Sequence, residues 1–163
     1  MINKKTYYLW GLFPLQEIEY LNFIKEKVQS KLISPYFDPH ITLSGPYLNI
    51  DETFISKLKS FGNENSSILL HVDGYCFKQE IFKSFYISIK NSQNLIDLRK
   101  NIFKLNKFDI DNIYNPHISL CYGNHQIQDK KELISKLPKL NKVIRISKIA
   151  LIEINNDINQ WNI

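Results

Sequence analysis

The sequence predicts an α+β fold in which residues 1–163 form a single domain. Segments rich in β-favouring residues alternate with segments whose apolar residues recur every three or four positions, as in amphipathic helices. The two halves of the chain also repeat one order: a long helix, a short strand that carries a histidine, and a second helix. With 44% hydrophobic residues, the chain can bury one sizeable core.

The first half opens with a strand and a helix. Residues 6–13 are dense in aromatic and β-favouring side chains and are followed by a proline, which indicates a strand. Residues 15–32 have the apolar spacing of an amphipathic helix. Asp51 then caps a helix that runs to about Phe61, with Gly62 as its stop. The expected inner face of the first helix consists of Leu15, Ile18, Leu21, Val28 and Leu32.

The second half continues the alternation. Residues 66–78 and 83–90 are two extended runs joined by a short polar connection, which indicates a hairpin. Residues 92–105 have helical periodicity. Residues 129–138 begin with an aspartate and carry a glutamate three positions later, which resembles the capping box of a helix. Residues 142–155 are a final β-rich stretch.

The net charge and the two cysteines exclude some classes of protein. The net charge of +5 comes almost wholly from lysine, because Arg99 and Arg145 are the only arginines. Lysines spread along a chain make a solvated surface with a mild preference for anionic substrates, not a nucleic-acid-binding face. Cys76 and Cys121 are too few for a disulfide framework and form no spaced metal pair. We therefore expect reduced thiols in a cytoplasmic protein.

No segment reaches the ~20 consecutive apolar residues that a membrane span requires, so we expect no membrane association. The apolar run after the first lysines resembles a signal peptide only superficially. It is interrupted by Tyr7, Tyr8 and Pro14 and lacks a small-residue cleavage site, so a first strand explains it better.

The stretch FDPHITLSGPY, residues 37–47, places a histidine directly behind a proline. Side chains two positions apart in a strand point the same way, so His40, Thr42 and Ser44 share one face. The isoleucine and leucine between them face the opposite side. Pro39 fixes its own backbone angle and makes the preceding residue extended, which holds the imidazole in place.

The stretch YNPHISLCYG, residues 114–123, repeats this arrangement in the second half. It places His117, Ser119 and Cys121 on one face, again behind a proline and backed by apolar side chains. Tyr122 adds a ring at the edge of the same face. We expect the two stretches to form the two halves of one catalytic site.

Two imidazoles and two hydroxyls suit the hydrolysis of a phosphodiester. The reaction needs a base, an acid and donors for the phosphoryl oxygens. His40 and His117 fill the acid and base roles, since histidine titrates near neutral pH. Thr42 and Ser119 are short donors for the phosphate, and Tyr122 suits nucleobase stacking. No metal or cofactor is needed, and none is expected.

Simpler interpretations apply to each motif. One Pro-His strand alone is usually structural, and a strand hydroxyl commonly makes only a local hydrogen bond. The doubling of the motif favours function. Cys121 is expected to be a packed residue, not a nucleophile. His71 is expected to be satisfied or at the surface, and His125 to be an exposed loop residue. Asp38 lies near His40, but the further ligands of a metal site are missing.

The segments PHITL (39–43) and PHISL (116–120) resemble the paired H-x-T/S-x signature of the two-histidine phosphoesterase superfamily, the group with the LigT-like fold. Within it, the chain is most similar to the cyclic phosphodiesterases of plants and yeast. The opening YYLWGLFP and the closing KIALIEINNDINQW match those proteins in order and spacing. The resemblance implies a bilobal α+β fold in which two antiparallel sheets line a central cleft, with helices packed outside.

The resemblance also implies hydrolysis of 2',3'-cyclic nucleotides or of ADP-ribose 1'',2''-cyclic phosphate. In that scheme His40 protonates the leaving oxygen, His117 activates water, Thr42 and Ser119 hold the phosphate, and Tyr122 lies beside the ligand. The expected binding partner is a nucleotide-like substrate with a cyclic phosphate, or an RNA end. The protein is expected to be a monomer without an obligate protein partner.

Several alternatives remain. The substrate is open among a cyclic nucleotide, ADP-ribose cyclic phosphate, 2',5'-linked oligoadenylate and a cyclic dinucleotide. The chain is somewhat short through the middle, so the presence of the family's substrate-covering loop stays open. A non-catalytic module that binds nucleotides or RNA ends is the alternative from a different class. The plant enzymes carry extra cysteines that pair, and this chain has no equivalent set, so redox control does not carry over.

Overall fold

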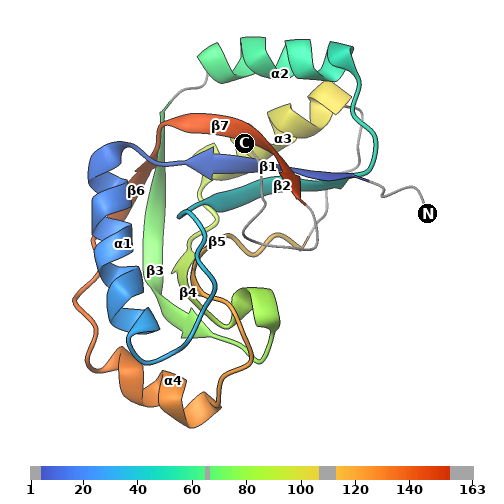
Figure 1. The fold of residues 1–163 in the computed structure, drawn as a ribbon. Helices are drawn as coiled ribbons and strands as arrows, with labels where there is room; N and C mark the ends of the chain where they lie inside the picture. Colours follow the sequence, from blue (N-terminus) through green and yellow to red (C-terminus); the bar gives the residue numbers. More distant parts are fainter. Residues whose placement is uncertain (1–4, 65–66, 107–112, 155–163) are drawn as a thin grey trace.

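The computed structural model describes residues 5–64, 67–106 and 113–154, which form an α+β fold of seven strands, four α-helices and one 3-10 helix (Figure 1). In chain order the elements are β1 (Thr6–Leu12), α1 (Leu15–Gln29), β2 (Ile41–Tyr47), α2 (Glu52–Glu64), β3 (Ile68–Phe77), η1 (Ile81–Lys83), β4 (Phe85–Ile89), α3 (Gln93–Asn106), β5 (His117–Cys121), α4 (Ile127–Ile134), β6 (Val143–Ile146) and β7 (Lys148–Ile154).

All seven strands pair antiparallel in one sheet, in the order β6-β3-β4-β5-β2-β1-β7. The first and last strands of this order are joined by a single residue, Ser147, whose amide donates to the carbonyl of Leu12 at 2.8 Å. The sheet must therefore curl until its two edges approach each other, as the ribbon shows (Figure 1). The predicted β-rich stretch 142–155 is thus two strands at opposite ends of the sheet.

The expected division into two separate sheets is not confirmed. The strands β2 and β5, which carry the two histidine motifs, join the two halves of the sheet through one register pair, Ile41 opposite Ile118. We call this junction the seam. Tyr114 supports it from outside the ladder, because its hydroxyl donates to the carbonyl of Thr42 at 2.8 Å. The seam keeps the histidine strands of the two halves adjacent.

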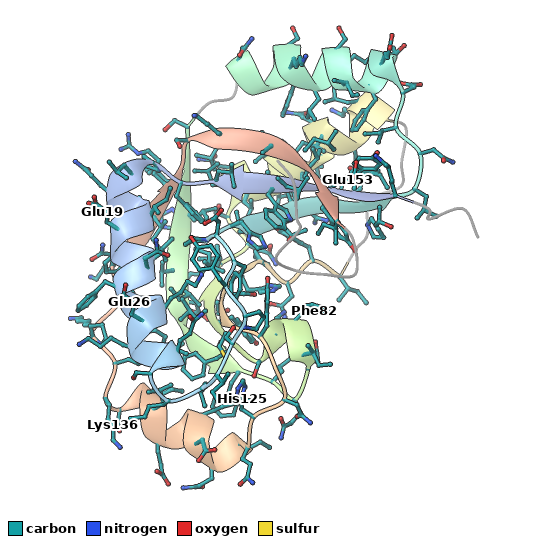
Figure 2. The ribbon with its side chains drawn as sticks, in the orientation of Figure 1. Glu19, Glu26, Phe82, His125, Lys136 and Glu153 are labelled. Carbon is teal, nitrogen blue, oxygen red and sulfur yellow. The ribbon has the colours of Figure 1, made fainter. Side chains whose placement is uncertain are left out.

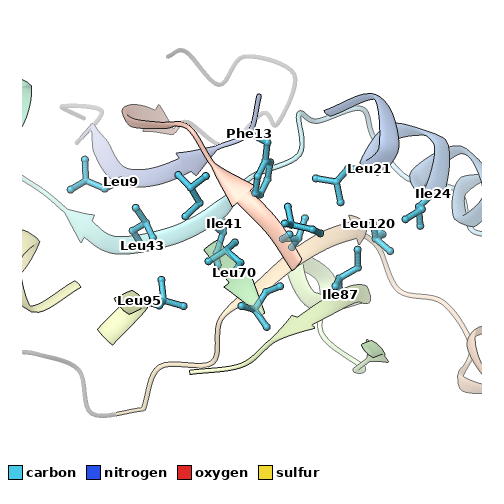
Figure 3. Close-up of a cluster of buried hydrophobic side chains, with 14 of the residues drawn as sticks. Leu9, Phe13, Leu21, Ile24, Ile41, Leu43, Leu70, Ile87, Leu95 and Leu120 are labelled. Atoms are coloured by element: carbon cyan, nitrogen blue, oxygen red, sulfur yellow. The ribbon is translucent and has the colours of Figure 1, made fainter. Parts of the chain in front are cut away.

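The apolar faces of both histidine strands lie in the core. Ile41, Leu43, Ile118 and Leu120 are completely buried, as their alternation predicts. Figure 3 shows Leu120 close to side chains of α1, which packs against β5. Burial of each such side chain contributes up to about 2 kcal/mol, so the strand backbones are firmly held. The polar faces are left to form a site on the other side of the sheet.

Several predicted helix boundaries shift. The cap at Asp51 is confirmed, since its carboxylate accepts the amide of Phe54 at 2.7 Å. However, α2 does not stop at Gly62 but continues to Glu64. The space around Gly62 is open, with no atom within 4 Å of where a Cβ atom would lie. The helix α4 begins after Gln126, so Asp129 lies in its first turn and not at its cap. A carboxylate in the first turn is still stabilised by the positive N-terminal end of the helix dipole.

The inner face of α1 also differs from the prediction. Leu15 is 70% exposed because it opens the helix, whereas Ile24 and Lys25 are buried. The helix ends at Gln29, before the predicted limit at residue 32. The last part of the closing segment, residues 155–163, lies outside the described residues. Among the helices that are described, none combines the length and apolarity needed to cross a membrane.

Candidate active site

A cavity of about 330 Å³ opens on the polar face of the seam. The cavity is lined by residues of the helix η1 and of four strands, β1, β2, β5 and β7, together with residues that flank β2 and β5. Its lining consists of Tyr8, Trp10, His40, Thr42, Phe82, His117, Ser119, Tyr122 and Ile154. All five side chains predicted from the sequence as site residues are therefore brought together.

The strand register arranges the four polar side chains. Because Ile41 lies opposite Ile118 in an antiparallel pair, one step in each direction places His40 across from Ser119 and Thr42 across from His117. Directly opposite side chains have Cβ atoms about 5 Å apart. The two imidazoles thus occupy one diagonal of a four-membered group, and the two hydroxyls occupy the other.

Both imidazoles are held by the same local hydrogen bond. The Nδ1 atom of His40 lies 2.8 Å from the carbonyl oxygen of Asp38, and Nδ1 of His117 lies 2.9 Å from that of Asn115. A carbonyl only accepts, so Nδ1 carries a proton in each ring. In the neutral ring, Nε2 is then the basic nitrogen. The proline between each carbonyl and its histidine keeps the backbone extended for this contact.

Burial favours the neutral form of both rings in the free protein. His40 is only 6% exposed, and burial lowers its pKa to about 4, an effect that the nearby His117 reinforces and the hydrogen bond to Asp38 opposes. Burial also lowers the pKa of His117, with the bond to Asn115 opposing it and Lys83 adding to it. The larger shift is that of His40. A bound anion would raise the pKa of both rings.

Aromatic rings pack against each imidazole. The indole of Trp10 stacks on His40, with ring centres 3.5 Å apart and planes 5° from parallel. Tyr86 meets His117 edge to face at 5.3 Å. Neither Trp10 nor Tyr86 is predicted as a site residue from the sequence, because each becomes a neighbour of its histidine only through strand pairing. To predict these two contacts from the sequence, one would need to know that β1 pairs with β2 and that β4 pairs with β5.

A buried lysine fixes the segment before His40. Lys25 donates to the carbonyl of Phe37, and its ammonium lies 3.9 Å from the centre of that ring. Burial lowers the pKa of Lys25 to about 8. The sequence did contain a signal for this residue: a lysine four positions after Leu21 and three before Val28 lies on the inner face of the helix. Inward lysines need a specific partner.

Tyr122 lines the cavity but is already engaged. Its ring stacks on Phe37 at 3.9 Å and meets Phe82 edge to face at 5.5 Å. One face is therefore unavailable to a base, and nucleobase stacking by Tyr122 stays a prediction. Burial raises the pKa of the Tyr122 phenol to about 12, and a hydrogen bond with Ser119 opposes the shift. The Ser119 hydroxyl also donates to the Phe82 carbonyl at a long 3.3 Å.

The other residues singled out from the sequence do not line the cavity. Ser44 is buried and accepts a hydrogen bond from the Tyr47 hydroxyl at 2.6 Å. Cys121 is fully buried, and burial raises the pKa of its thiol to about 11, which suits a packed residue. His71 is at the surface of β3, as expected.

His125, expected to be an exposed loop residue, is half-buried and makes two hydrogen-bond contacts. Its Nε2 lies 2.7 Å from the carbonyl of Ile33, and the Ser84 hydroxyl lies 3.2 Å from its Nδ1. His125 therefore connects the loop after α1 to the start of β4. Figure 2 shows it near α4, apart from Phe82.

Both cysteines are free: Cys76 is partly exposed and Cys121 is buried. Within residues 5–64, 67–106 and 113–154, no group of three or more His, Cys, Asp or Glu side chains has the arrangement of a metal site. Among these same residues, those that line the cavity include no carboxylate. Metal independence stays a prediction that a chelator can test.

No protein-family model matches the sequence, and neither does any curated protein. Solved structures do match. E. coli LigT in its apo form is 12% identical, with 97% of this chain and 92% of that chain covered and a TM-score of 0.66. E. coli LigT complexed with 3'-AMP is also 12% identical, with 98% and 93% covered and a TM-score of 0.63. A phosphoesterase is 13% identical, with 97% and 93% covered and a TM-score of 0.61.

Matches at this level of identity show a shared fold. They span nearly the whole of each chain. This chain therefore has the LigT-like α+β fold with a curled antiparallel sheet, which confirms the fold family expected from the paired histidine motifs.

Proposed function

We propose that the protein is a metal-independent phosphodiesterase that opens the cyclic phosphate of a 2',3'-cyclic nucleotide or of ADP-ribose 1'',2''-cyclic phosphate. The observation that carries the proposal is the cavity at the seam, where two imidazoles from distant parts of the chain accompany two hydroxyls. The fold it shares with E. coli LigT, which was solved as a complex with 3'-AMP, supports a nucleotide ligand.

The reaction follows from the diagonal arrangement. The phosphate lies over the seam, and the hydroxyls of Thr42 and Ser119 donate to its non-bridging oxygens. Nε2 of one histidine takes a proton from water as the water oxygen bonds to phosphorus. The other histidine, protonated at Nε2, gives its proton to the departing ester oxygen as that P–O bond breaks. From a 2',3'-cyclic nucleotide, the products are a 2'-phosphate and a free 3'-hydroxyl.

The division of roles between the histidines depends on the substrate. In the scheme taken from the family resemblance, His40 is the acid and His117 the base. In the free protein, however, burial disfavours the charged form of His40 more strongly. His40 therefore becomes the acid only if the anionic substrate raises its pKa. Proton uptake on binding of a phosphate ligand near pH 6 is the expected consequence.

The nucleoside binds between aromatic walls. Phe82 is 58% exposed although its ring lines the cavity, and Tyr8 lines the wall formed by β1. Figure 2 shows Phe82 at η1, on the side of the fold away from α1. An exposed ring beside a phosphate site suits a nucleobase, since every base has a face that can stack. The cavity volume is at the lower end of the range for small-molecule sites.

The direct test is incubation with 2',3'-cyclic AMP in the presence of EDTA, with separation of 2'-AMP from 3'-AMP. Turnover to 2'-AMP alone is the expected result. Loss of activity in EDTA that returns with a divalent cation would contradict metal independence. Binding of several cyclic substrates without turnover of any would favour the non-catalytic binding module instead.

A further inference from the structure

Trp10 and His40 stack in a geometry that favours a charged imidazole. Their ring centres lie 3.5 Å apart and their planes are 5° from parallel, so the indole covers the imidazole almost centre to centre. Two neutral aromatic rings prefer an offset or edge-to-face arrangement, with centres about 4.5 to 7 Å apart. A cation is instead attracted to the centre of a ring face, most strongly to that of an indole. This contact therefore suits an imidazolium better than a neutral imidazole.

His117 has the opposite kind of aromatic contact. The ring of Tyr86 meets it with centres 5.3 Å apart and planes at 67°, an arrangement that neutral aromatic pairs prefer. The hydrogen bonds at Nδ1 do not distinguish the two histidines, because both rings donate to a backbone carbonyl. The aromatic contacts do distinguish them: that of His40 suits a charged ring, and that of His117 suits a neutral one.

The strand register holds the indole beside the substrate. In the sheet, Trp10 lies opposite Thr42 of β2 on one side and opposite Ala150 of β7 on the other. Partners in an antiparallel pair share a face, so the indole lies on the face that carries the hydroxyl of Thr42. The small side chain of Ala150 leaves room for a large ring next to it. Trp10 is only 4% exposed although it lines the cavity, so the packing around it fixes its ring.

Other groups also act on the charge of His40. Burial disfavours the imidazolium most, and His117 of β5 and Lys25 of α1 add to this effect, whereas Asp38 opposes it through its carbonyl and its carboxylate. A bound phosphate anion favours the imidazolium and counteracts burial. Because the indole attracts the charged ring more than the neutral one, its contribution is largest when substrate is bound and His40 carries the proton.

We propose that Trp10 is a positioning residue that stabilises the protonated form of His40 in the substrate complex, and so makes His40 the acid and His117 the base. This inference deepens the proposed function and rests on it. It assigns the two roles from ring geometry, whereas burial in the free protein favours the reverse assignment.

A titration followed by NMR tests the effect on His40 without requiring turnover. The protein is saturated with 2'-AMP, and the pKa values of both histidines are measured in the wild type, in Trp10→Leu and in the control Tyr86→Leu. The pKa of His40 should be lower by about 1 in Trp10→Leu, as expected for the loss of a partly desolvated cation–π contact. A smaller side chain that merely admitted water would raise this pKa instead. Tyr86→Leu should leave it unchanged. An unchanged or higher pKa of His40 in Trp10→Leu would overturn the proposal.

A second comparison keeps the shape of the ring. Trp10 and Trp161 are the only tryptophans, so a Trp161→Phe protein carries fluorinated tryptophan at position 10 alone. Fluorine withdraws charge from the ring face and weakens its attraction for a cation with little change in size. The pKa of His40 in the 2'-AMP complex should fall stepwise from tryptophan to its monofluorinated and trifluorinated forms. Equal values in the three proteins would overturn the proposal even if Trp10→Leu did not fold.

Turnover of 2',3'-cyclic AMP connects the effect to catalysis. In the pH profile of kcat, the acid sets the high-pH limit of activity and the base sets the low-pH limit. Trp10→Leu should lower the high-pH limit by about one pH unit and leave the low-pH limit in place. Movement of the low-pH limit alone would identify His40 as the base and contradict the proposal. Absence of turnover in the wild type, with the lowered pKa of His40 retained in the NMR titration, would contradict only the proposed function.

Discussion

At the scale of single residues, the two histidines owe their orientation to the residue two positions earlier. In both motifs the imidazole donates from Nδ1 to the carbonyl that precedes the proline. The sequence X-Pro-His therefore positions a ring and selects its tautomer with only three residues. A proline can do this because it fixes its own backbone angle and keeps the residue before it extended.

Burial of His40 makes the stability of the fold depend on pH. The pKa of His40 is about 4 in the folded protein and about 6.5 in the unfolded chain, so the unfolded chain binds the proton more tightly. The stabilising contribution is complete above about pH 6.5 and is lost as the pH falls toward 4. Between pH 7.5 and 4.5, the wild type should lose about 2 to 3 kcal/mol more than His40→Asn in urea unfolding. Parallel losses in the two proteins would contradict this assignment.

Lys25 is expected to act as a positioning residue for His40. Lys25→Met keeps the length of the side chain but leaves the Phe37 carbonyl without its donor, which should cost about 1 to 3 kcal/mol in unfolding free energy. Because Phe37 also packs edge-on against His40, kcat should fall at least tenfold with little change in KM. Lys27→Met, on the exposed face of the same helix, is the matched control. Equal kcat values for the two variants would exclude the positioning role.

At the scale of the elements, the seam decides the distance between the two histidines. One register pair joins β2 to β5, and Tyr114 and Arg99 reinforce it from behind. The Arg99 guanidinium lies 3.5 Å from the centre of the Tyr114 ring, and its Nε donates to the carbonyl of Leu43 at 2.8 Å. Neither side chain lines the cavity, so both act on the site through the backbone of β2.

Tyr114→Phe tests the role of the seam by removing a single hydroxyl group. The loss of the hydrogen bond to Thr42 should cost about 1 kcal/mol of stability and should also lower kcat, because it loosens the spacing of the imidazoles. Tyr75→Phe removes a hydrogen bond of equal length, to Pro138, from a strand that does not form the seam. That control should show the loss of stability with an unchanged kcat. Thermal unfolding and steady-state kinetics of both variants give the comparison, and a normal kcat for Tyr114→Phe would refute the role of the seam.

The sequence was sufficient for most of the helices and strands and for the set of polar side chains that meet at the seam, since both depend on local patterns. The alternation around His40 and His117 indicates which side chains face the core, and the doubled motif indicates that they act together. Strand order is not local. The stretch 142–155 has the uniform character of one strand, and only tertiary pairing separates β6 from β7 at Ser147. For the same reason, Trp10 could not be assigned to His40 from its position in the first strand.

At the scale of the whole molecule, closure of the curled sheet depends on a glycine. A Cβ atom at Gly11 would lie 2.8 Å from Cδ1 of Ile146 and 2.9 Å from Cγ2 of Ile41. These short distances show that Ile146 of β6 packs directly against β1 and β2. The absence of a side chain at this position therefore allows β6 to approach β1 closely.

Gly11→Ala should destabilise the protein by about 1 to 3 kcal/mol, because buried side chains must shift to admit a methyl group. Gly62→Ala is the control of opposite sign. Position 62 lies in α2 with nothing within 4 Å of the added atom, so alanine should stabilise the helix by up to about 1 kcal/mol. Chemical unfolding of the two variants tests both signs, and a neutral Gly11→Ala would show that closure tolerates a side chain there.

The central claim is that His40 and His117 act as one acid–base pair across the seam. Asparagine retains a donor for the carbonyl that each imidazole contacts but cannot transfer protons, so the decisive measurement is kcat/KM for His40→Asn, His117→Asn and the double variant with a cyclic phosphate substrate. Each single variant should lose about 10² to 10⁴ in rate, and the double variant should lose no more than the worse single one. Losses below tenfold, or losses that multiply in the double variant, would contradict the claim.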